Sequence, residues 1–339
     1  MDPEPGTPSR RRSAFLLALT LFVAVSIVAG ATITGVAYWR FTIPGPLPES
    51  VTIIVPRGAG TRVIAGQLSA SGIIHDPWSF LAGAVALGDA GRIKAGEYTF
   101  AARASGRDVL AKLVAGDAVI RRLTIAEGLT TAQILAQIQA AEGLDGTIGP
   151  RPAEGDLLPE TYYYRYGDSR ADAVARMRRG MSETLAELWA KRAPDLPLSS
   201  PAQAVVLASI VEKETGLAAE RGRIAGVFYN RLRLGMRLQS DPTVIYGLTG
   251  GAGPLDRPLV RADLERDTPY NTYARDGLPP GPIANPGRQS LIAVLNPEAT
   301  DELYFVADGN GGHVFAKTLA EHNRNVARWR QIRNQGGGQ

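Results

Sequence analysis

Hydrophobic and polar positions divide most sharply at the N-terminus. An uncharged, mostly apolar run from Ser13 to Trp39 lies between Arg10–Arg12 and Arg40. A helix needs about 20 apolar residues to cross a bilayer, and the run ends in Tyr38-Trp39, aromatic residues of the kind found at membrane interfaces. This pattern predicts a transmembrane helix over residues 13–39. A cleaved signal peptide is the alternative, since Ala29-Gly30-Ala31 fits a small-x-small cleavage site, but apolar sequence continues past that site.

The charges around this run predict its orientation. Basic residues stay on the cytoplasmic side of a membrane, so the arginine cluster makes residues 1–12 a short cytoplasmic tail. The chain from residue 41 onward then lies on the outer side of the plasma (inner) membrane, in the periplasm or its extracytoplasmic equivalent. Residues 40–50 are rich in proline, which fits neither a regular helix nor an inner strand, and they predict a stalk.

Beyond the stalk, strand and helix periods alternate, which predicts an α+β fold. Residues 51–116 form a small module with a strand at 51–55, helices near 61–71 and 77–87, a strand at 95–100 and a helix at 105–113. Residues 117–198 form a connecting α+β region with a strand at 119–125, a helix at 130–141 and a long amphipathic helix at 171–192. A mainly α domain follows over residues 199–332, and residues 333–339 form a disordered Gly-rich tail.

One helix of the mainly α domain places a carboxyl group on its buried face. Ser200-Pro201 begins a helix and Gly216 stops it, which predicts a helix over residues 201–215. Gln203, Leu207, Ile210 and Glu214 share one stripe of this helix. Glu212 lies about 200° around the helix from Glu214 at 3.6 residues per turn, so the two carboxylates cannot share one site.

Burial of Glu214 suggests acid chemistry. A carboxyl group among apolar neighbours has a desolvated charged form, which raises its pKa and lets it act as a general acid near neutrality. The alternative is a helix-terminal Glu that pairs with an arginine or caps a loop.

The sequence after this helix is typical of a sugar-binding groove. A helix over residues 219–234 carries Tyr229-Asn230-Arg231, a polar turn covers residues 236–247, and an aromatic and Pro-rich loop covers residues 268–283. Aromatic faces and amide side chains are a natural lining for a groove that holds sugars and their amide substituents. The alternative is a long structural loop packed on a helical domain.

Composition narrows the chemistry further. The 339 residues include no Cys, which excludes disulfides, thiolate metal sites and Cys nucleophiles. Lys and Arg exceed Asp and Glu by 37 − 33 = 4, but they are scattered, so we expect no nucleic-acid partner. The histidines are His75, His313 and His322; their spacing suits no metal site and no Ser/His/Asp triad. We expect no metal and no cofactor, and we interpret His313 as structural or groove-lining.

Several stretches together carry a specific resemblance to a known family. They are Leu207–Thr215 (LASIVEKET), Tyr229–Leu232 (YNRL), Leu238–Gly247 (LQSDPTVIYG), Tyr270–Tyr273 (YNTY), Gly277–Ile283 (GLPPGPI) and Leu303–Ala307 (LYFVA). These stretches resemble the YceG-like (MltG) endolytic murein transglycosylases over essentially the whole chain. The module at 51–116 resembles the LysM-like subdomain of that family, and Glu214-Thr215 resembles the Glu-Ser pair on the active-site helix of lysozyme-like lytic transglycosylases. The chain diverges in the cytoplasmic tail, around residues 143–155 and at Gly250–Gly253.

The resemblance implies non-hydrolytic cleavage of the β-1,4 bond between N-acetylmuramic acid (MurNAc) and N-acetylglucosamine (GlcNAc) in peptidoglycan, leaving 1,6-anhydroMurNAc ends. It implies Glu214 as the catalytic acid and base, with Glu212 as second choice. It also implies a groove lined by Tyr229, Asn230, Gln239, Asp241, Thr243, Tyr246, Tyr270, Asn271, Thr272 and Tyr273. The expected partners are glycan strands, the membrane through the N-terminal helix, and peptidoglycan synthases; the anchor favours nascent strands near the membrane.

Two other functions remain open on the sequence. A hydrolytic muramidase would use Asp241 as the second carboxylate, and its product ends would differ. A non-catalytic, membrane-tethered cell-wall binding protein would hold glycan through the module at 51–116 and dock its C-terminal domain onto synthases. In that protein Glu214→Gln would leave function intact.

Overall fold

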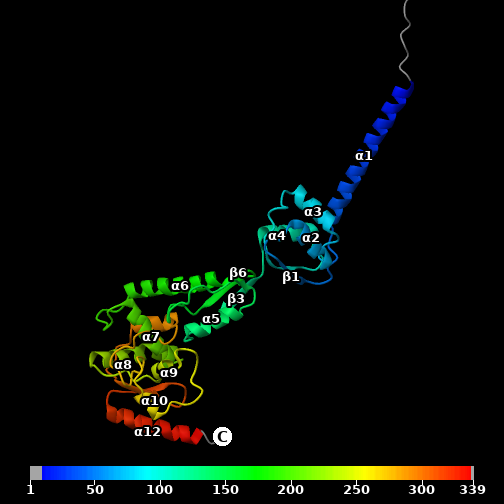
Figure 1. Cartoon of the computed structure of the whole chain (residues 1–339). Coiled ribbons are helices and arrows are strands. Elements are labelled where there is room, and N and C mark those ends of the chain that lie inside the picture. The colour runs from blue at the N-terminus through cyan, green and yellow to red at the C-terminus, as the bar shows by residue number, and fades with distance from the viewer. Residues whose placement is uncertain (1–9, 337–339) are drawn as a thin grey trace, which may run out of the picture. The chain divides into compact units, whose positions relative to one another are not determined.

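A computed structural model describes residues 10–336 of the chain (Figure 1). The chain forms two compact units, one that runs to Ile120 and includes Arg165–Gly167, and one made of Arg121–Tyr164 and the chain from Asp168 onward. Both units contain helices and strands, as the predicted α+β class requires.

The first unit begins with the apolar helix α1, Arg10–Thr42. Its segment Ser13–Thr42 has 30 residues and contains an 18-residue window with a mean hydropathy of 2.5, so it is long and apolar enough to cross a membrane. The helix ends three residues later than the pattern predicts. Residues 1–9 of the predicted tail lie outside the described residues.

The module that follows α1 has the predicted order of elements: β1 (Val51–Val55), α2 (Thr61–Ala70), α3 (Pro77–Ala86), β2 (Gly96–Phe100) and α4 (Gly106–Ala115). Strands β1 and β2 pair antiparallel, with Val51 opposite Phe100. Cap residues set the helix starts, because Asp76 accepts from the backbone of Ser79 at α3, and Ser105 and Asp108 form a capping box at α4.

The predicted stalk is not a free linker. Phe41 and Leu47 are buried in the core of the module. The Gly45 N–H donates to the Arg103 carbonyl at 3.1 Å, and the Arg103 N–H donates to the Leu47 carbonyl at 2.9 Å. Proline prevents regular structure here, but the apolar side chains between the prolines still pack inward.

The second unit starts with short strands and two helices. Strand β3 (Ile120–Thr124) pairs with β5 (Thr161–Arg165), and β4 (Leu144–Asp145) pairs in parallel with β6 (Asp168–Ser169). Helices α5 (Thr131–Ala140) and α6 (Arg170–Ala190) match their predicted positions, and both place apolar residues in a shared core.

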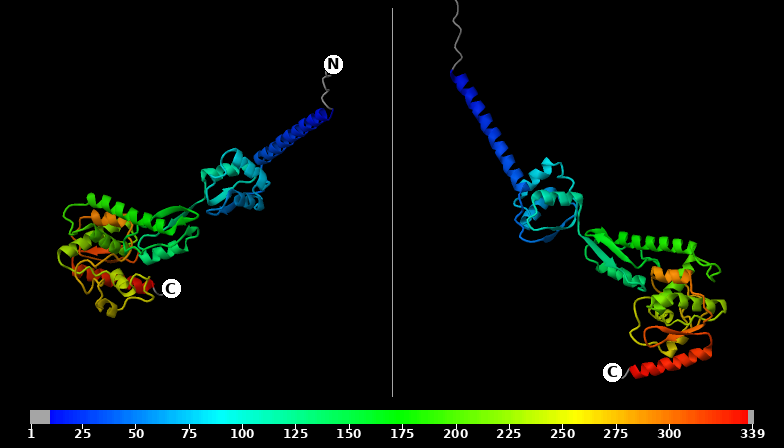
Figure 2. Two further views of the ribbon diagram at one scale, coloured as in Figure 1. Left: turned by 45° about the horizontal axis from the view of Figure 1, so that its top comes forward. Right: turned by 180° about the vertical axis from the view of Figure 1, so that it is seen from behind.

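The rest of the second unit is mainly helical and builds around α7. Its elements are α7 (Pro201–Glu214), the 3₁₀ turn η1 (Ala218–Glu220), α8 (Arg221–Arg233), α9 (Asp241–Thr249), α10 (Arg261–Glu265), α11 (Arg288–Leu295), β7 (Tyr304–Ala307), β8 (His313–Ala316) and α12 (Leu319–Gly336). Residues 204–211 of α7 are all buried, against α8 and α11 among others. Helix α12, coloured red, lies at the edge of this unit in the right-hand view of Figure 2.

Two local predictions differ from the structure. Residues 241–249, expected in a polar turn, form α9, because Pro242 suits the first turn of a helix and Gly250 ends it in a left-handed conformation. Residues 333–336, expected in a disordered tail, belong to α12. The remaining tail residues, 337–339, lie outside the described residues.

Candidate active site

Glu214 is the last residue of α7, at the point where this core helix reaches a cavity. Its Oε1 atom accepts a hydrogen bond from the Ser240 hydroxyl group. Ser240 is itself buried, and its backbone N–H donates to the Thr272 hydroxyl at 2.9 Å. The carboxyl group of Glu214 therefore has one fixed neutral donor on its protein side.

Burial raises the pKa of Glu214 from its usual 4.5 to about 7. The Ser240 hydrogen bond opposes this rise, the nearby carboxylate of Asp241 adds to it, and the positive groups of His313 and Arg231 reduce it. Near neutral pH the group is then divided between its acid and carboxylate forms. That division is what a residue needs to give and take one proton in a single reaction cycle.

The cavity at Glu214 has a volume of about 590 Å³. The β7–β8 hairpin, α12 and the segment before α9 form its walls, and its polar lining includes Arg231, Gln239, Asp241, Tyr273 and His313. The Tyr273 hydroxyl donates to Asp241 Oδ1 at 2.6 Å, which orients that carboxylate on the wall.

A second cavity of about 600 Å³ shares Asp241 with the first. Lys213, the neighbour of Glu214 in sequence, lines it, together with Tyr246 and Ile283. The rings of Tyr246 and Tyr270 meet with centroids 4.7 Å apart, and the Tyr246 hydroxyl donates to Glu154 at 3.2 Å. Polar and aromatic surfaces thus continue on both sides of Asp241.

Other residues predicted to line the groove lie elsewhere. The Tyr229 hydroxyl donates to the Val294 carbonyl at 2.7 Å within the core, and the Asn230 amide donates to the carbonyls of Thr300 and Glu302 at 2.8 and 3.0 Å. Neither residue lines the two cavities at Asp241. Their amide and hydroxyl groups satisfy backbone carbonyls of neighbouring segments.

The Asn271-Thr272 pair and Thr243 are likewise buried. The Asn271 amide donates to the carbonyls of Leu264 in α10 and of Arg266 just after it, at 2.9 and 2.7 Å, and the hydroxyls of Thr243 and Thr272 lie 2.8 Å apart. Because Thr272 also accepts from the Ser240 backbone, this buried network fixes the donor of Glu214. These residues support the site from within the buried network and are not among the residues that line the cavity of Glu214.

Glu212 has a different environment from Glu214, as the helical spacing predicts. Its side chain is 4% exposed, and its Oε1 atom lies 3.0 Å from Arg221 Nη2. Its other oxygen accepts from the Gly287 N–H at 2.8 Å. Glu127 contacts the same guanidinium group at 3.3 Å, so Glu212 is held in a buried ion-pair cluster and does not line the cavity of Glu214.

Sequence reasoning missed the partner of His313. His313 Nδ1 lies 2.7 Å from Glu220 Oε2, and the His313 backbone N–H donates to Glu220 Oε1 at 2.9 Å. The Thr215 hydroxyl also donates to Glu220, at 3.2 Å. Glu220 therefore connects the residue after Glu214 to the opposite cavity wall. It is 93 residues from His313 in sequence, and no local pattern marks it.

Arg231 also reached the cavity without being predicted as a site residue. It lies within the YNRL stretch, and its guanidinium group donates to the carbonyls of Leu303 and Leu238 at 2.7 and 2.6 Å. These bonds hold the positive guanidinium group of Arg231 at the cavity that Glu214 also lines.

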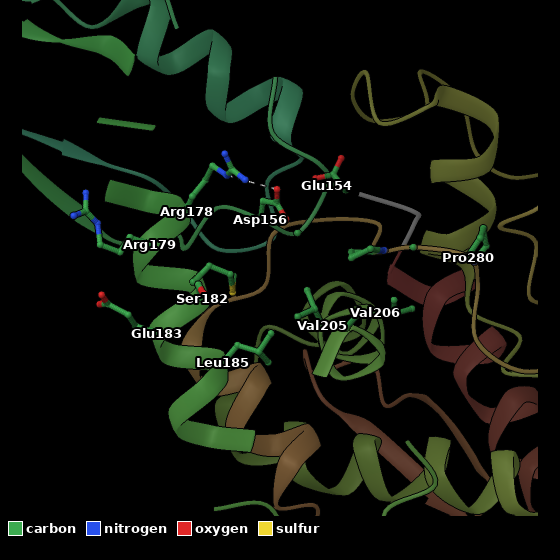
Figure 3. A pocket seen from close by; sticks show the side chains of 15 residues that line it. Glu154, Asp156, Arg178, Arg179, Ser182, Glu183, Leu185, Val205, Val206 and Pro280 are labelled. Atoms are coloured by element: carbon green, nitrogen blue, oxygen red, sulfur yellow. Dashed lines mark ion pairs between the residues drawn. The ribbon is translucent and has the colours of Figure 1, made fainter. Parts of the chain in front are cut away.

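A larger cavity, of about 750 Å³, lies between α6, α7 and residues 280–282 (Figure 3). Arg178 faces Asp156 across its mouth at 3.8 Å, and Val205 and Val206 form part of its floor. Glu214 does not line this cavity. Among residues 10–336, no group of three His, Asp or Glu side chains is arranged to hold a metal ion.

The fold is mixed α and β with one apolar N-terminal helix, and its candidate site has a carboxyl group, Glu214, on a cavity wall at the end of a core helix. A sequence model of the YceG-like family matches residues 53–328, and the chain belongs to that family. The resemblance noted in the sequence is thereby confirmed.

Relatives and a solved structure agree with this membership. The chain is 40% identical over 184 residues to an endolytic murein transglycosylase of Bacillus subtilis (strain 168), an alignment that covers 54% of this chain and 50% of the relative. It is 28% identical to an endolytic murein transglycosylase of Streptococcus pneumoniae (strain D39), covering 93% of this chain and 65% of the relative. The chain thus spans half to about two thirds of these relatives. A crystal structure of a putative YceG-like protein from Listeria monocytogenes matches with 32% identity and a TM-score of 0.54, covering 81% of this chain and 98% of that one.

Proposed function

We propose that the protein is a membrane-anchored endolytic peptidoglycan lytic transglycosylase, a carbon–oxygen lyase that cuts the MurNAc-β-1,4-GlcNAc bond and leaves 1,6-anhydroMurNAc ends. The observation that carries the proposal is Glu214, a single carboxyl group with a pKa raised to about 7 on the wall of a cavity. The names of the relatives support the substrate.

One carboxyl group can perform the whole reaction. Protonated Glu214 gives its proton to the glycosidic oxygen as the bond from that oxygen to C1 breaks. The C6 hydroxyl of MurNAc attacks C1 and forms the 1,6-anhydro ring, and its proton passes to the Glu214 carboxylate. The acid is restored and no water is consumed. A raised pKa suits both steps. Glu214 must be protonated before it donates to the glycosidic oxygen, and its carboxylate must then be basic enough to accept the proton of the C6 hydroxyl.

The environment of Glu212 supports this assignment. Its carboxylate is already paired with Arg221 and the Gly287 backbone, and it does not line the cavity of Glu214. Glu212, the second choice on sequence, is therefore assigned a structural role.

Within the groove, we assign substrate contacts to Gln239, Asp241, Tyr246 and Tyr273, which line the two cavities. Tyr270 supports Tyr246 by ring contact. Tyr229, Asn230, Thr243, Asn271 and Thr272 are assigned to holding the loops that form the walls.

The remaining parts of the chain suggest where it acts. We assign glycan holding to the LysM-like module of the first unit and a lysozyme-like role to α7. With α1 in the plasma (inner) membrane and its N-terminus in the cytoplasm, the catalytic unit is extracytoplasmic. Nascent glycan strands near the membrane are then its substrate, and peptidoglycan synthases its protein partners.

A hydrolytic muramidase is the second candidate, because Asp241 lies on the same cavity wall as Glu214. Retaining and inverting glycosidases both need a second carboxylate, as nucleophile or as base for water. In this site the Asp241 carboxylate accepts a hydrogen bond from the Tyr273 hydroxyl at 2.6 Å. This bond lowers the availability of Asp241 as a nucleophile.

Mass spectrometry of the products tests the proposal. The full chain in detergent, its Glu214→Gln variant and its Glu183→Gln variant are each incubated with purified peptidoglycan; Glu183 is an exposed carboxylate on α6 and serves as the control. We expect anhydro-muramoyl ends from wild type and Glu183→Gln, and none from Glu214→Gln. Reducing ends would identify a muramidase. Absence of cleavage by wild type, with retained binding to peptidoglycan, would favour a non-catalytic cell-wall protein.

A further inference from the structure

Helix α3 exposes a face unlike that of other helices in its module. No charged residue occurs in Pro77–Ala86, and its outward stripe consists of Trp78, Ala82, Val85 and Ala86. Trp78 is 73% exposed and Val85 is 69% exposed. A helix beside water normally has polar or charged residues on its outer face, as α4 has with Arg107, Asp108 and Lys112. The outer face of α3 is instead suited to an apolar environment.

The end of α1 is fixed against this helix. Phe41, in the last turn of α1, is buried in the module, and a Cβ atom at Gly83 of α3 would lie 2.7 Å from its ring. A Cβ atom at Gly106, the first residue of α4, would lie 3.0 Å from the same ring. Arg40 Nη1 pairs with the α3 cap residue Asp76 at 3.4 Å. Both glycines permit close contact, so α3 lies beside the end of α1 (Figure 1).

The length of α1 brings its end to the membrane surface. Its 30-residue apolar segment spans about 45 Å at 1.5 Å per residue, against a hydrocarbon core of about 30 Å. The last turns then lie at the level of the lipid headgroups, where Tyr38 and Trp39 are exposed on α1. Trp78 places a third aromatic side chain on the helix packed beside them, and aromatic belts occur at this level.

We propose that the outer face of α3, defined by Trp78, Ala82, Val85 and Ala86, lies in the interfacial layer of the bilayer that α1 crosses. The first unit then contacts the lipid bilayer through this face of α3. The inference rests on the membrane anchoring in the proposed function. Lipid is the occupant because the face is uncharged, apolar along its whole length and belongs to the helix that packs against the end of α1. A protein partner would leave the same face out of the lipid, which the depth measurement below detects.

The absence of cysteine makes this inference testable in the full chain. Single-cysteine variants carry a nitroxide label after reconstitution into vesicles of phosphatidylcholine and phosphatidylglycerol. Val85→Cys reports on the α3 face. Ile54→Cys is the matched aqueous control, an exposed aliphatic residue on β1, which lies on the other side of the module from α3 (Figure 1). Ser26→Cys reports on the middle of α1. Collision rates with oxygen, which concentrates in lipid, and with a water-soluble nickel chelate give the depth of each label.

We expect the oxygen-to-nickel ratio at Val85 to exceed that at Ile54 several-fold and to be lower than that at Ser26. Equal ratios at Val85 and Ile54, with Ser26 deep in the bilayer, would overturn the seating of α3 and leave the anchor intact. An aqueous Ser26 label would overturn both.

A second measurement uses charge. Ala82→Glu, added to the Val85→Cys chain, places a carboxylate on the same stripe; Ala82→Gln is the uncharged control. We expect the glutamate to lower the oxygen-to-nickel ratio at Val85 several-fold and the glutamine to change it little. A label depth insensitive to the glutamate would contradict the proposal.

Discussion

The Ser240 hydroxyl group donates a hydrogen bond to Glu214 across 26 residues of sequence, from the start of α9 to the end of α7. Ser240 is buried and its backbone N–H donates to Thr272, so the backbone that carries this donor is held in place. The bond stabilises the carboxylate, whereas burial stabilises the neutral acid. The pKa of about 7 is the balance of these opposing effects.

Ser240→Ala removes the donor and leaves the burial. The pKa of Glu214 should then rise further, because the carboxylate loses its hydrogen bond. We expect the alkaline limb of the rate profile to move up by about one pH unit, equivalent to about 1.4 kcal/mol. Measuring kcat from pH 5 to 9 on purified glycan strands tests this. Ser182→Ala, an exposed position on α6, should reproduce the wild-type profile. An unchanged limb in Ser240→Ala would mean that the bond does not set the proton affinity.

The raised pKa of Glu214 also links stability to pH. In the unfolded chain the group titrates near 4.5, and in the folded chain near 7, so between these values the folded state binds more protons. Stability from this group is full below pH 4.5 and falls as pH rises through 7. The loss amounts to at most about 3 kcal/mol.

Glu214→Gln, neutral at every pH, should therefore be more stable than wild type at pH 8 and close to it at pH 5. Thermal unfolding of both proteins at the two pH values measures the difference. Glu183→Gln should show no such pH-dependent gain. A Glu214→Gln protein no more stable than wild type at pH 8 would show that the folded carboxylate carries no burial cost.

Local patterns predicted the elements that place Glu214. Ser200 and Pro201 mark the start of α7, and the structure has Glu214 as the last residue of this helix, on the wall of a cavity. Such signals are local, because caps and helix periodicity depend on residues within a few turns. Helix α12 is mostly polar and was not predicted, although its apolar residues Leu319, Val326 and Trp329 share the face that lines the cavity.

Side-chain chemistry alone could not distinguish residues that line the groove from residues that hold the surrounding loops in place. Asn230 and Asn271 have the amide groups expected for sugar contacts, but amides serve backbone carbonyls equally well, and here they do so. Which face a side chain takes depends on segments distant in sequence. The contact between His313 and Glu220 depends on the placement of β8 against η1, which no spacing in the sequence reports.

Glu220 is expected to act on catalysis through His313. Glu220 accepts hydrogen bonds from the His313 backbone N–H and the Thr215 hydroxyl, and its Oε2 atom lies 2.7 Å from His313 Nδ1. Thr215 is next to Glu214 in the sequence. Glu220→Gln keeps the shape of the side chain but weakens these contacts, because a neutral amide is a poorer acceptor. We expect kcat to fall about tenfold, with KM little changed, since the loss falls on the geometry around the acid. Steady-state rates on soluble glycan measure both parameters. A rise in KM at constant kcat would instead assign the contact to substrate binding.

The Glu212–Arg221 pair provides the last prediction, one of stability. Their side chains are 4% and 10% exposed, and Arg221 also contacts Glu127. Removing one partner from a buried pair leaves the other charge without compensation, at a cost of about 3–5 kcal/mol. Arg221→Gln should therefore lower the unfolding temperature of the second unit markedly. Arg261→Gln is the matched control, because Arg261 pairs with Glu265 at 2.8 Å but is 91% exposed, and such surface pairs contribute less than about 1 kcal/mol. Thermal unfolding of the full chain in detergent, followed by tryptophan fluorescence, measures the difference; Trp189 and Trp329 report on the second unit, and Trp39 and Trp78 on the first. Equal effects of the two substitutions would show that the buried Arg221 ion pairs stabilise the fold no more than an exposed ion pair does, and that they do not hold α7 in place.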